Sequence, residues 1–584
     1  MKTLIIAVNS KFIHSSLAPW YLKASCGNRY GDIRVLEFSI NDNPDSIIGT
    51  VYAEKPDIAA FSCYIWNLEY VLGLAESLKK VLPELRIILG GPEVSYNAPD
   101  IMRSNTFIDC IISGEGEHSF RLLLCCLKDG STRIGEIDGV SYREQGVVIS
   151  NRSRPLIDDL DSIPSPYTHE MLSTLGNRIA YFESSRGCPY SCSYCLSSTF
   201  EGVRYFSMER VRQDLAKLIN SGARIVKFVD RTFNCSRTRA KEIFRYIAGI
   251  PAGSFHFEVA ADLFDEEMLD MLSGMPEGLV QLEIGIQTTN EATLSAVSRK
   301  TDVEKAFYNI SRLIAAGNIH VHLDLIAGLP LEDFDSFRRS FNDVYDLKPH
   351  HLQLGFLKLL RGSRMREEAE EHGYQYNSHP PYEFLYNRYI SYEQVLRLKG
   401  IEELLEKYYN SGRHASSLEF LIKKFFGTPF DFYSDFYNFV NETGYIRRAV
   451  SARDSYRILL KFAHRMADDE SFYILKELMK LDFLASDSSG TLPDGLERDV
   501  IQGFKERCHD FLRDGRNITG YLPEYEGISV KQLYKQVHFE PFRCDVTGDC
   551  ADSGVMEPYT VLLFDYSKKS RVTGLYKYHK VKLF

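Results

Sequence analysis

The chain has 584 residues, of which 44% are hydrophobic and 25% are charged, a composition typical of a globular protein with several domains. Its formal net charge of −10 disfavours a nucleic-acid surface, so we expect no nucleic-acid partner. No apolar stretch approaches the roughly 20 residues of a membrane span, and the apolar run after Met1 is too short for a signal peptide. We therefore expect a cytoplasmic protein with no membrane partner.

Residues 1–137 alternate short apolar runs with segments of helical periodicity. Such an alternation predicts a parallel, doubly wound, Rossmann-like domain, in which a ligand binds at the carboxyl ends of the strands. The predicted strands lie at 4–8, 35–38, 58–61, 87–89 and 109–112, and the predicted helices at 16–24, 47–53, 68–81 and 118–127.

Residues 138–175 are predicted to be a connecting strap, because a hairpin pattern around Gly146 is followed by a segment rich in Asp and Pro. A second strand–helix alternation fills residues 176–379. Its six units predict a partial (β/α)6 barrel, with an active site at the C-terminal ends of the strands. The predicted strands are 179–183, 225–229, 255–260, 280–284, 320–326 and 351–356.

Residues 380–584 are predicted to be mainly helical, with a β-hairpin at the end. They are rich in Tyr and Phe, and two explanations stay open: a cap over the barrel mouth that binds an organic substrate, or the packed core of a helical domain. His538, Cys544 and Cys550 are too loosely spaced to be favoured as a metal site.

Three cysteines follow Gly187 in the spacing C-x3-C-x2-C: Cys188, Cys192 and Cys195. Thiolates are ligands for iron–sulfur clusters or for zinc. Structural zinc requires four protein ligands at paired spacings, and the sequence has no second C-x2-C. The loop therefore predicts a [4Fe–4S] cluster in which one iron has no protein ligand.

This loop, including Tyr194 before the third cysteine, resembles the signature of the radical S-adenosylmethionine (SAM) superfamily. The resemblance implies that SAM chelates the open iron and yields a 5′-deoxyadenosyl radical, with an electron donor such as flavodoxin or ferredoxin. A Glu or Gln that points into the barrel can equally be a core side chain whose hydrogen bonds are made within the protein, and Arg299 can be a charge on the surface of a helix. The resemblance implies SAM-binding roles for Tyr194, Asp230, Glu283, Gln287, Arg299, Ile326 and Leu357.

Two glycine-containing turns follow strands of the first domain and let the backbone approach a ligand closely. Lying upstream of the cluster loop, they resemble the cobalamin-binding domain of B12-dependent radical SAM enzymes. The D-x-H-x-x-G motif is absent from residues 1–140, and we hypothesise that His14 approaches the corrin; the alternative is that its ring caps the following helix. The resemblance implies cobalamin contacts for Ser62, Gly90, Gly91, Pro92, Glu93, Gly114, Glu115, Gly116 and Glu117.

These patterns together predict a radical SAM enzyme with cobalamin, which methylates an unactivated carbon of a small-molecule or peptide substrate. A cobalamin-assisted cyclase, rearrangement or redox enzyme is the first alternative, and a non-catalytic cobalamin or redox sensor is the second. Residues 380–584 resemble the uncharacterised C-terminal extension of one subgroup of B12-dependent radical enzymes, from which neither fold nor substrate follows.

Overall fold

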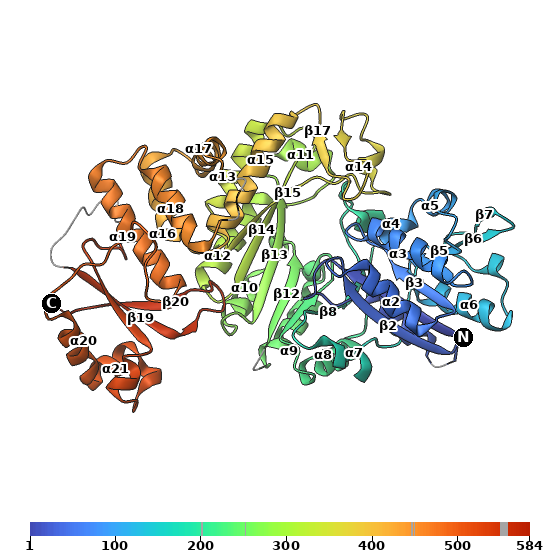
Figure 1. Ribbon diagram of the computed structural model, residues 1–584, viewed down its shortest axis with the longest axis horizontal. Coiled ribbons are helices and arrows are strands. Elements are labelled where there is room, and N and C mark those ends of the chain that lie inside the picture. The colour runs from blue at the N-terminus through green and yellow to red at the C-terminus, as the bar shows by residue number, and fades with distance from the viewer. Residues whose placement is uncertain are drawn as a thin grey trace.

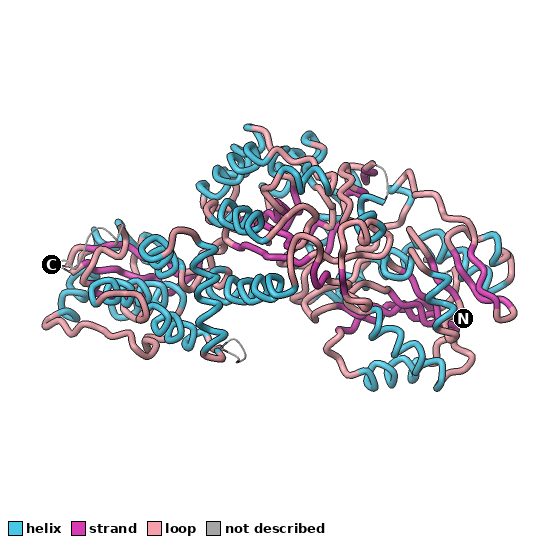
Figure 2. The backbone as a smooth tube through the Cα atoms, turned by 90° about the horizontal axis from the view of Figure 1, so that it is seen from above, coloured by secondary structure: helices cyan, strands magenta, loops and turns pink. Residues whose placement is uncertain are grey.

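The computed structural model describes residues 1–27, 29–199, 202–250, 253–445, 448, 450–548 and 559–583. Figure 1 shows three parts that follow one another along the longest axis: an N-terminal α/β domain, a central barrel and a C-terminal extension. Figure 2, from above, shows the same order, with the two ends of the chain far apart. Cys550 lies outside the described residues.

The N-terminal domain contains the predicted parallel sheet. Its parallel strands are ordered β2-β1-β3-β4-β5, a doubly wound arrangement whose strand order reverses between β1 and β3. Helices cover both faces, which is why Leu4–Val8 in β1 is buried throughout. The elements are β1 Lys2–Asn9, α1 Ala18–Cys26, β2 Asp32–Ser39, α2 Pro44–Glu54, β3 Ile58–Ser62, α3 Leu68–Val81, β4 Arg86–Gly90, α4 Pro92–Ser95, α5 Ala98–Ser104, β5 Cys110–Ile112, α6 Gly116–Asp129, β6 Val140–Glu144 and β7 Val147–Ser150.

The predicted hairpin at 140–150 is present, but its assignment to the connecting strap was wrong. Strand β6 pairs antiparallel with β5, placing Val140 opposite Ile112, so the hairpin extends the N-terminal sheet. Val140 and Tyr142 are buried against that domain's core, which explains why the segment packs there instead of bridging domains. The connection to the barrel begins only after Ser150.

All six predicted barrel strands form one parallel sheet, in the order β8-β11-β12-β13-β14-β15. Apolar side chains on their outer face pack against helices, while alternate residues face the interior, as the burial of β13 shows. The elements are α7 His169–Leu175, β8 Ala180–Phe182, β9 Ser185–Gly187, β10 Val203–Tyr205, α8 Met208–Asn220, β11 Ile225–Phe228, α9 Arg237–Ala248, β12 Ser254–Val259, α10 Glu266–Ser273, β13 Val280–Gln287, α11 Glu291–Ala296, α12 Val303–Ala316, β14 His320–Ala327, α13 Phe334–Tyr345, β15 His351–Phe356, α14 Arg364–Glu367, β16 Gln375–Tyr376 and β17 Phe384–Tyr386.

The extension is mainly helical, as predicted, and ends in a small antiparallel sheet ordered β18-β19-β20. Across the described residues, no helix combines the length and apolar character required to cross a bilayer. The elements are α15 Tyr392–Leu404, the π-helix η6 Leu405–Tyr409, α16 Ala415–Phe425, α17 Pro429–Glu442, α18 Ala452–Ala463, α19 Asp469–Ser486, α20 Phe504–Arg513, α21 Gly515–Tyr521, α22 Val530–Leu533, β18 Val537–Phe542, β19 Thr560–Lys569 and β20 Tyr576–Val581.

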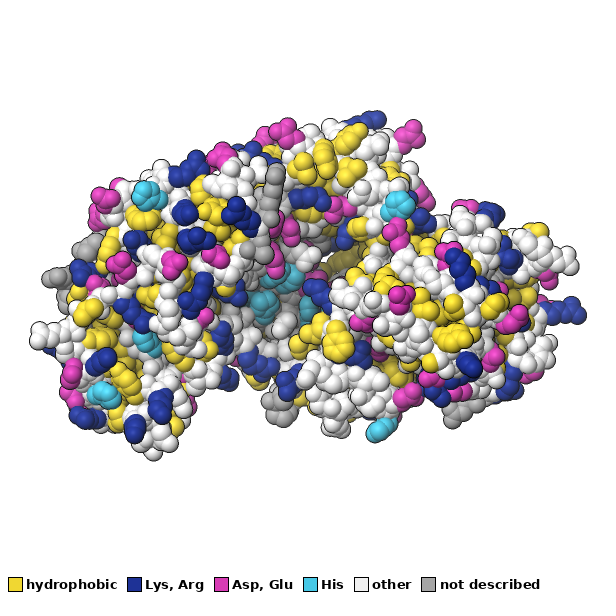
Figure 3. Space-filling view, in the orientation of Figure 1, with side chains coloured by type: hydrophobic (Ala, Val, Ile, Leu, Met, Phe, Trp, Pro, Cys, Tyr) yellow, Lys and Arg dark blue, Asp and Glu magenta, His cyan; other side chains and the backbone are white. Residues whose placement is uncertain are grey.

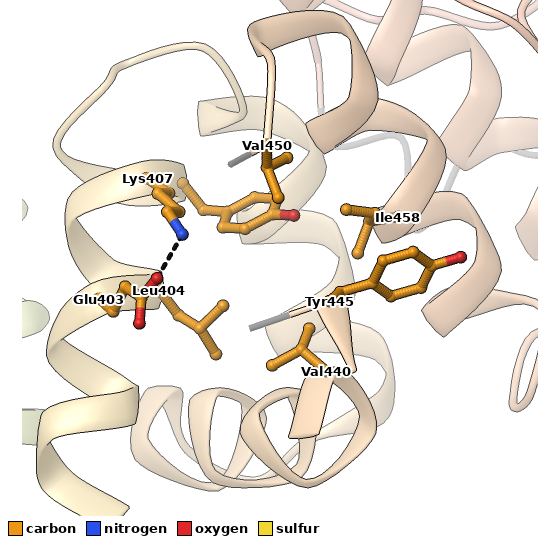
Figure 4. Close-up of a pocket in the computed structure, with 8 residues that line it drawn as sticks. Glu403, Leu404, Lys407, Val440, Tyr445, Val450 and Ile458 are labelled. Carbon is orange, nitrogen blue, oxygen red and sulfur yellow. Dashed lines mark hydrogen bonds and ion pairs between the residues drawn. The ribbon is translucent and has the colours of Figure 1, made fainter. Parts of the chain in front are cut away.

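The aromatic residues at 430–439 form a packed core. Phe462 of α18 lies with its ring centroid 4.8 Å from that of Phe436 and 5.9 Å from that of Phe432. The cavity beside these helices, lined by Leu404, Tyr445 and their neighbours, measures about 10 Å³ (Figure 4), room for a single water. The helical-core explanation therefore accounts for this patch.

The extension contacts the barrel at its open edge and at its lower end. The side chain of Asn410 donates to the carbonyl of Leu352 and accepts from its amide, both at 2.9 Å, as a neighbouring strand would. Below, the β19–β20 turn brings the carbonyl oxygen of Val572 to 2.9 Å from Nδ1 of His320, and the amide of Arg571 donates to Glu277. These contacts attach the extension to the side and the floor of the barrel.

Candidate cluster and cofactor site

The cluster loop leaves the barrel at the end of its first strands. Strand β9 pairs antiparallel with β10, and Gly187 at its end has φ +102°. A Cβ at Gly187 would lie 2.2 Å from the carbonyl oxygen of Gly202, so only glycine allows the chain to turn here into Cys188.

The three loop cysteines are free thiols, with Cys192 buried and Cys188 and Cys195 partly exposed. In the described ranges, no group of three or more His, Cys, Asp or Glu side chains converges on a position for a single metal ion. A cubane cluster presents a separate iron to each thiolate, and three thiols without a fourth ligand fit that group.

Arg299 lies behind the cluster loop. Its Nη1 donates to Tyr194 Oη at 3.3 Å and to Cys192 Sγ at 3.8 Å. The side chain follows α11 and is largely enclosed, so it is no helix-surface charge. Burial alone lowers its pKa, but Tyr194 and Cys192 raise it overall, and the guanidinium stays charged.

Two buried polar atoms beside this arginine fit a ligand. Nε of Arg299 and Oε1 of Gln287 find no hydrogen-bond partner in the part of the chain that the structure describes. Gly285 makes room for them, because a Cβ there would lie 2.0 Å from Nε2 of Gln287. One unpaired donor and one unpaired acceptor suit the amino-acid end of SAM.

Asp230, for which the sequence predicts a contact with SAM, has a carboxylate that is hydrogen-bonded within the protein. Its carboxylate is buried and accepts hydrogen bonds from the amide of Ser184 at 3.0 Å and from the hydroxyls of Ser184 and Ser185 at 2.6 and 2.5 Å. Burial raises its pKa, although these bonds oppose the rise. Asp230 therefore positions the strand that leads into Cys188.

Glu283 was also predicted to contact SAM, but its carboxylate is already paired. Nζ of Lys227 and Nε2 of His256 each lie 3.0 Å from Oε2. Burial by itself raises the pKa of Glu283, yet the contact with His256 and the charge of Lys227 hold that pKa well below its usual range. The residue belongs to a charged layer inside the barrel.

Ile326 and Leu357, predicted near the adenine, lie at the carboxyl end of β14 and just after β15. Ile326 faces the barrel interior. Leu357 is buried, its amide donates to Ala327 and its carbonyl accepts from Phe384. Leu357 therefore offers an apolar side chain and no free backbone group.

The predicted cobalamin turns meet at one edge of the N-terminal sheet. Ser62 ends β3 beside Gly90 at the end of β4, and its buried hydroxyl has no hydrogen-bond partner within the described residues. Gly91, which precedes Pro92 at the start of α4, has φ +113°, and a Cβ there would lie 2.5 Å from the carbonyl oxygen of Cys63. Gly114 has open space around it. A cradle with an unpaired hydroxyl fits a bulky cofactor.

The side chains of the three glutamates in these turns have partners within the protein, and their contacts with cobalamin remain a prediction. Glu93 accepts a hydrogen bond from Tyr382. Glu115 forms ion pairs with Arg204 at 2.8 Å and with Arg186 at 3.2 Å, and Glu117 pairs with Arg186 at 2.6 Å.

Arg186 is a site residue that the sequence analysis missed. Its guanidinium also contacts Glu183 at 3.1 Å, so it binds three carboxylates directly before Gly187 and Cys188. Burial lowers its pKa, but the carboxylates raise it overall. The arginine therefore fixes the cluster loop to the turn at 115–117 of the N-terminal sheet. The run Glu183 to Cys188, dense in polar residues after a strand, was the available signal.

His14 contacts the barrel. Its Nδ1 lies 2.8 Å from the hydroxyl of Tyr181, and its backbone bridges to Ile179. Helix α1 has Leu17 at its N-cap, with no side-chain cap, so the capping alternative is wrong. Burial, followed by Lys11 and Lys227, lowers the pKa of His14, which keeps the imidazole neutral. An approach of its other nitrogen to the corrin remains a hypothesis.

The barrel interior carries a polar layer, of which the sequence analysis named only Glu283. Figure 3 shows histidine and acidic side chains gathered in the hollow over the central strands. Burial raises the pKa of Glu258 to about 7 and lowers that of His351 to about 4. The sequence signal for this layer was the presence of polar residues at every second position of strands whose intervening residues are apolar. The layer comprises Lys227, His256, Glu258, Glu283, His322, Asp324 and His351.

Replacing Glu332 with glutamine is expected to reduce the amount by which the free energy of unfolding falls as pH rises. Thr288 donates to its Oε1 at 2.5 Å, and burial raises the pKa of Glu332 from 4.5 to about 7. The protonated form therefore stabilises the fold below pH 4.5, and that contribution disappears as pH rises to about 7, a total of about 3 kcal/mol. Urea unfolding at pH 5 and pH 8 measures the difference; equal pH slopes in both proteins would contradict the assignment.

Comparison with known proteins gives three matching families. Residues 3–124 match the B12 binding domain, residues 182–344 match the radical SAM superfamily, and residues 370–564 match a protein of unknown function (DUF4080). The first two imply cobalamin, a [4Fe–4S] cluster and SAM as cofactors.

Similar proteins share the first two parts. The chain is 26% identical to the cobalamin-dependent radical SAM methyltransferase TokK of Streptomyces tokunonensis, over 55% of this chain and 50% of TokK. It is 24% identical to the anaerobic magnesium-protoporphyrin IX monomethyl ester cyclase of Rubrivivax gelatinosus, over 56% of this chain and 61% of the cyclase. The chain spans about half the length of the first of these curated relatives.

A solved structure shows the same fold over most of the molecule. The cobalamin-dependent SAM radical enzyme OxsB, with aqua-cobalamin bound, superposes with a TM-score of 0.58 at 15% identity, covering 91% of this chain and 81% of OxsB. The chain therefore belongs to the radical SAM enzymes that carry an N-terminal B12-binding domain.

Proposed function

We propose that this protein is a cobalamin-dependent radical SAM methyltransferase that acts on an unactivated carbon of a small-molecule or peptide substrate. The observation that carries the proposal is the junction at Arg186. This one side chain binds Glu115 and Glu117 at the edge of the B12-binding domain and lies two residues before Cys188. The site for a methyl donor and the site for a radical are thus held together.

In this function, the chain's own residues bind, orient and enclose the cofactors. Cys188, Cys192 and Cys195 would hold the cluster, and Arg299 with Gln287 would hold the amino-acid end of SAM. When bound, these groups supply a 5′-deoxyadenosyl radical that removes a hydrogen atom, and cobalamin supplies the methyl group.

Anaerobic turnover with methyl-deuterated SAM tests the proposal. Reconstituted protein, a one-electron donor such as flavodoxin and cell extract are expected to give 5′-deoxyadenosine together with a product that carries the labelled methyl group. The fate of that label separates methyl transfer from other radical reactions.

A cyclase-type reaction is the second candidate, because the relatives include cyclases. It predicts 5′-deoxyadenosine with no labelled product. A cobalamin or redox sensor predicts neither, although the enclosed donor and acceptor beside Cys192 favour an enzyme over a sensor.

A further inference from the structure

A cavity of about 260 Å³ lies between the open edge of the barrel and the helix that runs along it. On the barrel side are residues 351–354 of β15, of which His351 and Gln353 face the interior by strand alternation. On the other side are the end of α15 and the π-helix η6, a type of irregularity frequent at functional sites. The cavity is lined by His351, Leu352, Gln353, Leu354, Glu402, Leu405, Glu406 and Asn410.

The charge of this cavity is negative. Glu402 and Glu406 line it, and among its described lining residues there is no lysine or arginine. Two lysines on α15 and η6 have other partners, since Lys399 pairs with Glu383 and Lys407 with Glu403. Burial raises the pKa of Glu402, Glu406 and Glu403 raise it further, and the charge of Lys399 only partly opposes this rise.

His351 connects the cavity with the barrel interior. Its Nε2 lies 3.9 Å from Oε2 of Glu406, and its ring centroid lies 4.2 Å from that of His322. Behind it, inside the barrel, Nε2 of His322 lies 3.0 Å from Oδ1 of Asp324. His351 therefore lies between Glu406 and the polar layer of the barrel.

We propose that this cavity binds a positively charged alkylamine or alkylguanidine group of the substrate, with Glu402 and Glu406 as its counter-ions. The substrate enters beside β15, its cation stays between the glutamates, and its uncharged remainder extends past His351 into the barrel. The inference rests on the proposed function for its use in catalysis, but binding can be measured without turnover.

Calorimetric titration of the reconstituted full-length protein, with SAM present and no reductant, tests the proposal. Agmatine and the peptide acetyl-Gly-Arg-Gly-amide are the cationic probes, and 1,4-butanediol and succinate are the neutral and anionic ones. Agmatine binding alone identifies a free small molecule, and tighter peptide binding identifies a peptide side chain. Replacing both Glu402 and Glu406 with glutamine is expected to weaken binding of the cationic probes by at least about tenfold.

Glu403→Gln is the matched control. Glu403 lies on the same helix and its loss removes the same charge, but it pairs with Lys407 and lines the small cavity of Figure 4. This variant is expected to bind agmatine like the unmodified protein. Absence of binding by both cations, equal binding of succinate, or equal weakening in the control would overturn the proposal. Formation of 5′-deoxyadenosine by the same preparation reports separately on the proposed function.

Discussion

Replacing Cys192 with alanine is expected to remove the iron–sulfur cluster and all formation of 5′-deoxyadenosine. The thiol is buried between Arg299 and the loop, where no other described thiol can take its place. Loss of a side chain that hydrogen-bonds to a metal ligand typically lowers metal affinity or activity by about 10–100-fold, and loss of the ligand itself lowers them more. We therefore expect formation of 5′-deoxyadenosine to fall by at least about 100-fold. Iron and sulfide analysis of anaerobically reconstituted protein, with chromatography of the nucleoside product, measures it.

The matched control for this experiment is Cys235→Ala. Its thiol lies 3.2 Å from the hydroxyl of Tyr205, near enough to Cys188 for the two charges to interact, but outside the C-x3-C-x2-C loop. This variant is expected to retain the full iron content and product formation. Loss of iron in Cys235→Ala would show that a fourth thiolate closes the cluster, and the proposed function would then fail. Circular dichroism of both variants excludes unfolding as the cause.

Replacing Arg186 with alanine is expected to destabilise the junction of the N-terminal domain and the barrel by about 3–5 kcal/mol. The change leaves Glu115, Glu117 and Glu183 enclosed together, with Arg204 as the remaining cation at Glu115. Uncompensated buried carboxylates repel one another and lose hydration. Urea unfolding followed by fluorescence and by iron release measures the effect, and both transitions are expected to shift to lower urea.

Two further variants make this prediction specific. Arg212→Ala, on α8, removes a solvent-exposed ion pair with Glu242 of α9 and is expected to cost less than about 1 kcal/mol. Adding Glu117→Gln and Glu183→Gln to Arg186→Ala is expected to recover part of the loss, because charge repulsion disappears. An equal cost for Arg186→Ala and Arg212→Ala would contradict the role of Arg186 as the connection between the domains.

The fold could be predicted from the sequence wherever the spacing of apolar residues matches the strands and helices that the topology requires. The six barrel strands appear at the predicted positions because apolar residues on alternate positions pack under helices, and the cluster loop follows directly from cysteine spacing. The hairpin at 140–150 was misplaced because its strand pattern does not reveal its partner. Pairing with β5 depends on which sheet edge is free, a property of the folded domain.

The site was harder to predict, because the same residue type can bind a ligand or a neighbouring side chain. Asp230 has the position expected for a ligand contact, yet two serines next to each other in sequence use its carboxylate. Glu115 and Glu117 likewise meet arginines that lie about 70 residues or more further along the chain. Such pairs become visible only when the domains are docked.

The floor contact between Val572 and His320 has a consequence for synthesis of the chain. The two residues are 252 positions apart, which at about 5–20 residues per second corresponds to roughly 10–50 s of translation. The six strands leave the ribosome long before the turn that seals them from below. A nascent chain interrupted in this interval presents a barrel whose lower end is still accessible to chaperones and proteases.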